Sequence, residues 1–337
     1  MFRRILVPLD GSQRSERALP IAARIARATQ GSLLLVRVVH SPSDVAVYGA
    51  EPALAVEPSS FEKHLADANR YLQMVIETYT HELEGLHVMT DVESGGISSA
   101  IFTAARLEHV DLIVLCHHGE TGLMRWIFQS VAQQAVRHSP VPVLALNVHA
   151  TMPPVSDPMH IWRALVPLDG SELAECALEP AAHLMTALAS PGQAELHLLS
   201  VVDSHTISGN SSALASPPST EMPEQARKGA ELYLERVMRQ VQQGPLASLP
   251  LTLSTSTVIS SDVPAAILRH TNQEPSIEAG YDLIAMATYG RSGVRRLLMG
   301  SVTEHLLGTT MHPMLVVRPT EVSAPSVPSA FVESAHS

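Results

Sequence analysis

The sequence of 337 residues contains only two cysteines, Cys116 and Cys176. This number is too small for a fold held together by several disulfides or by a cysteine-rich zinc site. A disulfide framework needs several cysteines, and a zinc knuckle needs cysteines or histidines at short regular spacings. Cys116, His117 and His118 are consecutive, and neighbouring residues on a strand point to opposite faces, so they cannot all bind one ion. We therefore predict two reduced thiols and no metal site.

Charged residues and long apolar runs are also scarce. Charged residues make up 16% of the chain and the formal net charge is −11, whereas a surface for nucleic acid or anionic lipid needs a basic patch. The apolar run that follows Arg3 and Arg4 is interrupted by Pro8 and Asp10, and no other segment approaches membrane-spanning length. We expect a cytoplasmic protein that binds neither nucleic acid nor membrane.

The sequence does contain an internal duplication. LVPLDG stands at residues 6–11 and again at 165–170, and DLIVLCHHG at 111–119 corresponds to DLIAMATYG at 282–290. The offset grows from 159 at the first motif to 171 at the second, so the second copy has longer loops. Because the period is too long for a solenoid, we predict a duplicated domain. The expected parts are domain one at 1–147, a linker at 148–160, domain two at 161–318, a mobile loop at 204–223 and a disordered tail at 319–337.

Each copy alternates short apolar runs with helical patterns, which predicts an α/β fold. The runs are rich in Val, Ile and Leu throughout, as in strands buried on both faces, so we expect two Rossmann-like domains, each with a five-stranded parallel sheet flanked by helices. In such sheets the ligand crevice lies beyond the carboxyl ends of the strands. The expected strands are 4–9, 33–39, 87–92, 111–116 and 142–147, then 164–168, 195–202, 251–258, 282–287 and 313–317; the expected helices of the first copy are 13–29, 59–83, 97–108 and 129–138.

The loop after the fourth strand of the second copy combines the features of an anion site. Ser301 and Glu304 form a capping-box pattern, which predicts a helix that starts at Ser301. The first turn of a helix offers free backbone N–H groups and a partial positive charge. Gly300 lets the backbone approach an anion closely, and Arg291 adds positive charge. Together these residues predict a phosphate-binding site.

The same loop resembles a known signature. Gly290, Gly300 and Ser301 match the Gly-x2-Gly-x9-Gly-(Ser/Thr) pattern of the universal stress protein family, with Ala287 in place of its first glycine. The resemblance covers nearly all of both copies, including the VPLDGS opening of each. It implies tandem adenine nucleotide alpha hydrolase-like domains that bind ATP or ADP and that pair through their last strands into a pseudo-dimer. We expect Mg2+ to accompany the nucleotide. The binding residues that it implies are Pro167, Asp169, Val201, Val202, Ala287, Gly290, Arg291, Gly300, Ser301 and Val302.

Several of these residues have a structural interpretation as well. Asp169 fits a helix N-cap equally well, because Asp169 and Glu172 also form a capping-box pattern. Val201 and Val202 fit plain sheet core. The first copy has Gln129 at the position of Gly300 and Glu120 at the position of Arg291. The glutamine places a side chain in the anion site, and the glutamate places a negative charge near the phosphates. We therefore predict that domain one binds nucleotide weakly or not at all.

Two motifs of enzymes are missing. The sequence has no Gly-x-Ser-x-Gly elbow and no Gly-x4-Gly-Lys-(Ser/Thr) loop, so we expect no enzyme, or at most slow ATP hydrolysis. The first hypothesis is a stress-response regulator that binds nucleotide in domain two, uses domain one as its pairing partner, and can form a homodimer or recruit a protein partner. The alternative is a ligand-free interaction scaffold. The third hypothesis is an enzyme that shares only its fold with this family.

Overall fold

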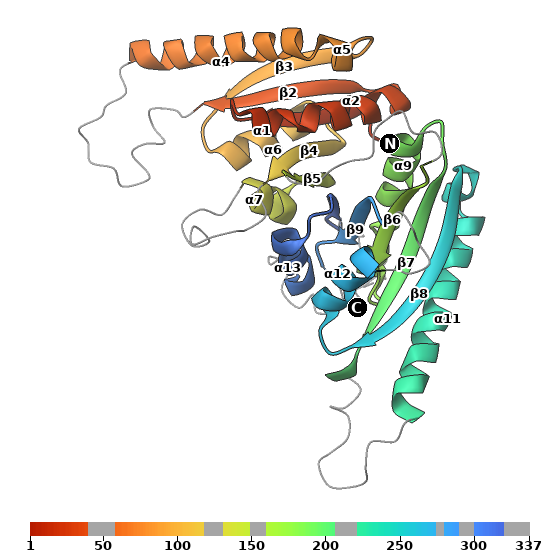
Figure 1. The fold of residues 1–337 in the computed structure, drawn as a ribbon. Helices are drawn as coiled ribbons and strands as arrows, with labels where there is room; N and C mark the ends of the chain where they lie inside the picture. Colours follow the sequence, from red (N-terminus) through yellow and green to blue (C-terminus); the bar gives the residue numbers. More distant parts are fainter. Residues whose placement is uncertain are drawn as a thin grey trace, which may run out of the picture.

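The ten strands among the described residues of the computed structural model join one sheet (Figure 1), and their order is β3-β2-β1-β4-β5-β10-β9-β6-β7-β8. The structure describes residues 1–39, 58–117, 131–148, 160–205, 221–273, 280–289 and 300–319. Strands β1 to β5 form the first half and β6 to β10 the second half. Each half repeats the same parallel order, and the halves meet where β5 and β10 pair antiparallel. The predicted Rossmann-like α/β fold is confirmed, and the two predicted five-stranded sheets are the halves of one continuous sheet.

The first half follows the predicted alternation of strands and helices. Its strands lie within two residues of the predicted runs. Four of these runs carry fully buried apolar side chains, whereas the strand His87–Ser94, at the edge of the sheet, is only partly buried. The strands are β1 (Arg4–Leu9), β2 (Ser32–Val39), β3 (His87–Ser94), β4 (Leu112–His117) and β5 (Val143–Asn147), and the helices are α1 (Gln13–Glu16), α2 (Ala18–Thr29), α4 (Pro58–Thr78), α5 (Thr80–Leu83), α6 (Ile97–Leu107) and α7 (Val131–His138).

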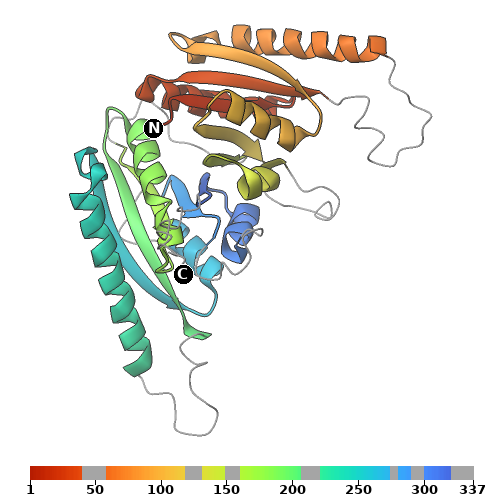
Figure 2. The same ribbon diagram turned by 180° about the vertical axis from the view of Figure 1, so that it is seen from behind.

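The second half has the same order of elements. Figures 1 and 2 show α4 and α11 at opposite ends of the molecule, each lying along the outer strands of its half. The strands are β6 (Trp162–Pro167), β7 (Ala194–Asp203), β8 (Leu251–Ser260), β9 (Leu283–Ala287) and β10 (Met314–Val317), and the helices are α8 (Glu172–Glu175), α9 (Leu178–Ala189), α11 (Glu221–Gln243), the 3-10 turn Pro245–Ser248, α12 (Val263–Gln273) and α13 (Ser301–Thr309).

Three predicted boundaries are wrong. The helix expected over 13–29 is two helices that meet at Arg17, because Pro20 has no N–H to continue the hydrogen-bond ladder of α1. The helix expected over 59–83 is interrupted at Tyr79, which separates α4 from α5. The loop expected over 204–223 ends earlier, since α11 begins at Glu221; residues 206–220 lie outside the described part of the chain.

The hydrophobic core is continuous between the halves on both faces of the sheet. One apolar cluster joins α2 of the first half to α9 of the second. The other joins α6 and α7 to α12 and α13. At the junction, Leu144 of β5 and Leu315 of β10 are paired and completely buried. The predicted pairing of the two copies through their last strands is therefore confirmed.

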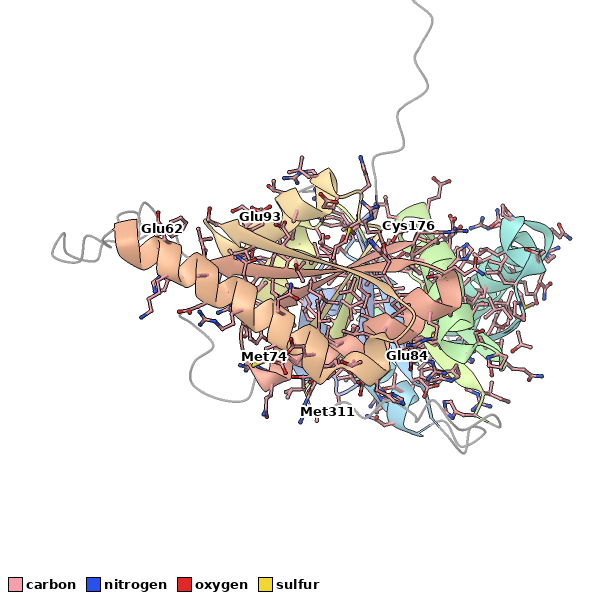
Figure 3. All side chains as sticks on the ribbon, turned by 90° about the horizontal axis from the view of Figure 1, so that it is seen from above. Glu62, Met74, Glu84, Glu93, Cys176 and Met311 are labelled. Carbon is pink, nitrogen blue, oxygen red and sulfur yellow. The ribbon has the colours of Figure 1, made fainter. Side chains whose placement is uncertain are left out.

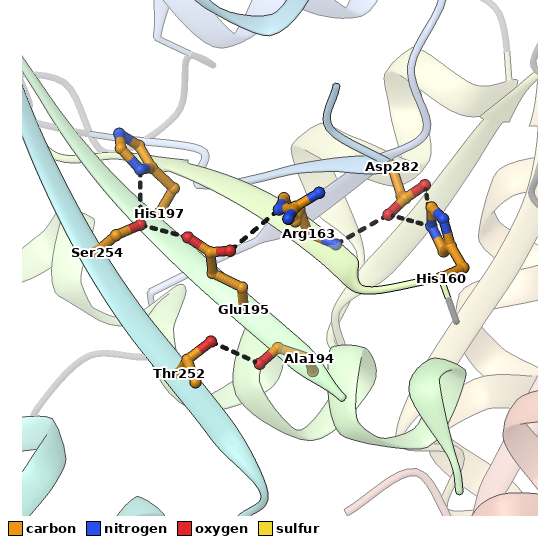
Figure 4. Close-up of polar contacts among 8 residues, drawn as sticks. All are labelled: His160, Arg163, Ala194, Glu195, His197, Thr252, Ser254 and Asp282. Carbon is orange, nitrogen blue, oxygen red and sulfur yellow. Dashed lines mark hydrogen bonds and ion pairs between the residues drawn. The ribbon is translucent and has the colours of Figure 1, made fainter. Parts of the chain in front are cut away.

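An aspartate fixes the start of the first strand in each half. Asp111 accepts hydrogen bonds from the backbone N–H groups of Arg3 and Arg4, at 2.8 and 3.1 Å. Asp282 accepts one from the N–H of Arg163 at 2.8 Å and contacts Nε2 of His160 at 2.9 Å (Figure 4). Asp111 therefore anchors the first residues of β1, and Asp282 anchors those of β6.

Apolar side chains also remain on the surface, among them Met74 and Met311 (Figure 3). Single exposed residues of this kind are ordinary in globular proteins. Within the described ranges, the helices are all too short or too polar to cross a membrane.

Candidate functional site

A cavity of about 120 Å3 lies at the carboxyl end of the second-half sheet. The ends of β6, β7 and β9 form its floor, and the first residues of α12 and α13 form its wall. This is the edge at which open parallel sheets bind their ligands. Seven of the residues predicted for the site line it: Pro167, Asp169, Val201, Ala287, Gly300, Ser301 and Val302.

The other three predicted residues are not placed in this cavity. Val202 follows Val201 on β7 and is not among the residues that line it, because consecutive side chains of a strand point to opposite faces. Gly290 and Arg291 lie outside the described residues. Strand periodicity could have separated the two valines, since Leu199 and Val201 both reach the cavity.

Asp169 does not cap a helix itself. The N-cap of α8 is Ser171, whose hydroxyl accepts from the N–H of Ala174 at 3.2 Å. Asp169 in turn accepts from the N–H and the hydroxyl of Ser171, at 3.0 and 2.6 Å. The interpretation of Asp169 as the N-cap is therefore wrong. Asp169 orients Ser171, and Ser171 caps the helix. Its carboxylate is half-buried at the cavity edge.

The helix after the fourth strand starts as predicted, but the capping box does not form. Gly300 is the N-cap of α13, and no side chain caps that helix. The N–H of Gly300 donates to the carbonyl of Thr288 at 2.7 Å, which closes the loop at its base. Glu304 does not reach back to Ser301, because its carboxylate binds Arg137 of the first half at 2.6 Å.

The first turn of α13 nevertheless leaves backbone donors available. The N–H groups of Ser301, Val302 and Thr303 have no acceptor in the described part of the chain. The three residues line the cavity, so these donors and the positive end of the helix dipole lie at its wall. The Thr303 hydroxyl is engaged elsewhere, since it donates to the carbonyl of Ala287 at 3.0 Å.

A polar group that the sequence analysis missed also lies in this cavity. Thr288 follows β9, is 1% exposed and lines the cavity. Its hydroxyl is buried and has no hydrogen-bond partner among the described residues. Buried polar groups are nearly always satisfied, so this hydroxyl requires an explanation. Its position directly after the strand is the signal that could have identified it.

An equivalent cavity is present in the first half, with a volume of about 360 Å3. Pro8, Asp10, Cys116 and Val131 line it, and they correspond in chain position to Pro167, Asp169, Ala287 and Val302 of the second half. The first copy has thus kept a cavity although its loop sequence differs. Gln129 and Glu120, on which the prediction of lost nucleotide binding rests, lie outside the described residues.

No group of three or more potential metal ligands occurs among the side chains that the structure describes. Of the three consecutive residues considered for a metal, Cys116 and His117 lie on β4 and His118 is outside the described part.

Comparison with known proteins agrees with this architecture. The model of the universal stress protein family matches residues 1–147 and 161–318. A universal stress protein of Mycolicibacterium smegmatis is 23% identical over 320 residues, covering 94% of this chain and 97% of its own. One from Mycobacterium tuberculosis is 25% identical over 321 residues, covering 93% and 96%.

Solved structures give the same result for the fold. The crystal structure of a universal stress protein from Archaeoglobus fulgidus superposes with a TM-score of 0.62 at 18% identity, covering 94% of this chain and 99% of its own. A second structure, from Pseudomonas aeruginosa, has a TM-score of 0.57 at 19% identity. With the family model matching both halves, the chain belongs to the universal stress protein family.

Proposed function

We propose that this protein is a cytoplasmic stress-response regulator that binds ATP or ADP in the cavity of its second domain. The domains extend over residues 1–147 and 161–318, with 148–160 as the linker and 319–337 as a tail. Binding, and not turnover, is the proposed activity. The first domain contributes by pairing with the second through β5 and β10.

The observation that carries the proposal is a set of unsatisfied donors around one cavity. Thr288, with its buried hydroxyl, and the residues Ser301, Val302 and Thr303, with their N–H groups, all line it. A nucleotide offers acceptors for both, because its base or ribose would enter the cavity while its phosphates would meet the helix start. The apolar side chains of Val201 and Met286 would pack against the ring.

The size of the cavity limits how much of the nucleotide it can hold. About 120 Å3 is less than the roughly 300–1,000 Å3 typical of sites for whole drug-sized ligands. Only one ring system fits inside, and the phosphates would lie outside over the first turn of α13. Mg2+ would then bind to phosphate oxygens and water, as it commonly does with nucleotides.

Thermal unfolding of the full chain with ATP, ADP or neither tests the proposal. A ligand that binds only the native state at 100 times its Kd adds about 2.7 kcal/mol, which raises the midpoint by several degrees. Thr288→Val should leave the stability of the free protein unchanged or higher, since it removes an unpaired hydroxyl. It should weaken nucleotide binding about tenfold.

The matched control is Thr257→Val on β8, which removes another buried hydroxyl that has no partner among the described residues. Thr257 does not line the cavity. Its nucleotide affinity should equal that of the parent. If millimolar ATP and ADP both leave the midpoint of the parent unchanged, the nucleotide assignment fails and the ligand-free scaffold becomes the better explanation.

A further inference from the structure

The outer strand of the second half, β8, lies at one end of the sheet (Figure 1). It pairs with β7 along its whole length. Helices α11 and α12 each pack on both β7 and β8, on opposite faces, so they cover the faces of the sheet and not its edge. The backbone N–H and C=O groups that point away from β7 therefore have no partner strand in the described part of the chain.

The sequence of β8 does not protect this edge. Natural edge strands are usually short, or they carry charged residues or proline, which prevent pairing with another chain. β8 is ten residues long and consists only of threonine, serine and aliphatic residues. A strand that paired with it would meet no like charge and would bury no charged group.

The opposite edge of the sheet is protected. It is formed by β3, which carries Asp91 and Glu93 two residues apart and therefore on one face. Burial raises the pKa of Glu93, and the neighbouring Asp91 raises it further, so the two carboxylates already repel each other. A strand that paired with β3 would bury both groups more deeply, which is costly. Only one of the two edges is thus suited to pairing.

A second copy of the same strand is the partner that fits β8. Two identical strands pair antiparallel about a two-fold axis, which brings the same patch of both molecules together. Thr255 lies near the middle of β8 and is exposed. When it stands opposite its counterpart, Leu253 of one copy faces Thr257 of the other, and residues 251–259 all gain a partner. Pairs of threonine and aliphatic side chains of this kind stabilise antiparallel strands.

We propose that two copies of this protein associate through β8, antiparallel and centred on Thr255, so that one sheet continues through both molecules. The chain already joins its own halves in this manner, since β5 and β10 pair antiparallel. The association closes at two copies, because each molecule uses its unprotected edge. Pairing of β8 with β3 of another copy would instead produce open filaments, and the carboxylates of Asp91 and Glu93 oppose it.

Sedimentation velocity of the full chain over a range of concentrations tests this interface. The parent should form dimers. Thr255→Glu and Thr255→Lys should each weaken the dimer by about tenfold or more, because like charges then face each other across the two-fold axis. Neither substitution should disturb the fold, since the side chain is exposed. Ser94→Glu, at the exposed end of β3, is the matched control and should keep the dimer affinity of the parent.

An equimolar mixture of the two Thr255 variants makes the test specific for the proposed register. Opposite charges then face each other, so dimers that contain one chain of each variant should form again. This recovery also shows that the variants are folded. A parent that stays monomeric, a mixture that stays monomeric, or a Thr255→Glu dimer as tight as that of the parent would overturn the proposal.

Discussion

The two thiols of the chain are held in their neutral form by burial. Burial raises the pKa of both Cys116, beside the first-half cavity, and Cys176, which ends α8 (Figure 3), to about 11 from an ordinary 9.0. A raised folded-state pKa means that the folded protein retains its thiol protons between pH 9 and 11 while the unfolded chain releases them. Their contribution to stability is present below pH 9 and is lost as the pH rises through 11.

Urea unfolding at pH 8.5, 9.5 and 10.5 measures this contribution. The free energy of unfolding of the parent should fall more steeply across this range than that of the Cys116→Ser, Cys176→Ser double variant, in which neither thiol titrates. The difference between the two proteins is the relevant quantity, because they share every other titratable group. Parallel pH profiles would mean that both thiols are exposed to solvent.

The residues of the site differ in how far the sequence could place them. Ala287 and Gly300 were predictable, since both lie at an end of an element with a clear pattern. Glu304 was misassigned to a cap, because its partner Arg137 belongs to the other half and no local pattern reveals it. The unsatisfied hydroxyl of Thr288 depends on what surrounds it in three dimensions, which one sequence does not specify.

The elements of the second half carry a buried polar cluster whose central histidine is replaced by an apolar residue at the equivalent position of the first half. Nδ1 of His197 on β7 contacts the Ser254 hydroxyl at 2.8 Å, and Nε2 contacts Ser256 at 2.6 Å, both on β8. Ser254 in turn donates to Glu195 at 2.6 Å (Figure 4). His197 is 6% exposed, whereas the equivalent position of β2 is the apolar Leu34. Apolar periodicity predicted both strands, but it gave no signal of this cluster.

His197→Leu is therefore expected to be destabilising even though leucine suits the first half. The substitution removes the His197 contacts of two hydroxyls on β8, although Ser254 keeps Glu195 and Ser256 keeps Nε2 of His270 at 3.3 Å. The loss of these contacts should therefore cost about 1 kcal/mol in the free energy of unfolding. Urea unfolding at pH 7.5 gives the value. His205→Leu, an exposed histidine just beyond the same strand, is the control and should change stability by less than about 0.5 kcal/mol. Equal effects of the two substitutions would show that the cluster adds no stability.

At the scale of the whole molecule, the two halves are joined by more than their linker. Leu144 and Leu315 pair across β5 and β10, and Nδ2 of Asn147 donates to the carbonyl of Thr310 at 3.0 Å. On one face of the sheet, the Arg24 guanidinium lies 4.4 Å from the ring centre of Trp162. The sequence predicted the strand pairing by family resemblance only, because the apolar runs of β5 and β10 do not identify their partners.

A protease site placed within residues 149–159 tests whether these contacts are sufficient. After cleavage, the two fragments should elute together at the volume of the uncut chain, because buried leucines and a shared core still join them. The Arg137–Glu304 pair contributes little, since Glu304 is half-exposed, so Arg137→Ala should not separate the fragments. Leu144→Asp should separate them, because it places an unpaired charge at the buried centre of the junction. Elution of the parent fragments as two smaller species would mean that the linker, and not the sheet, holds the halves together.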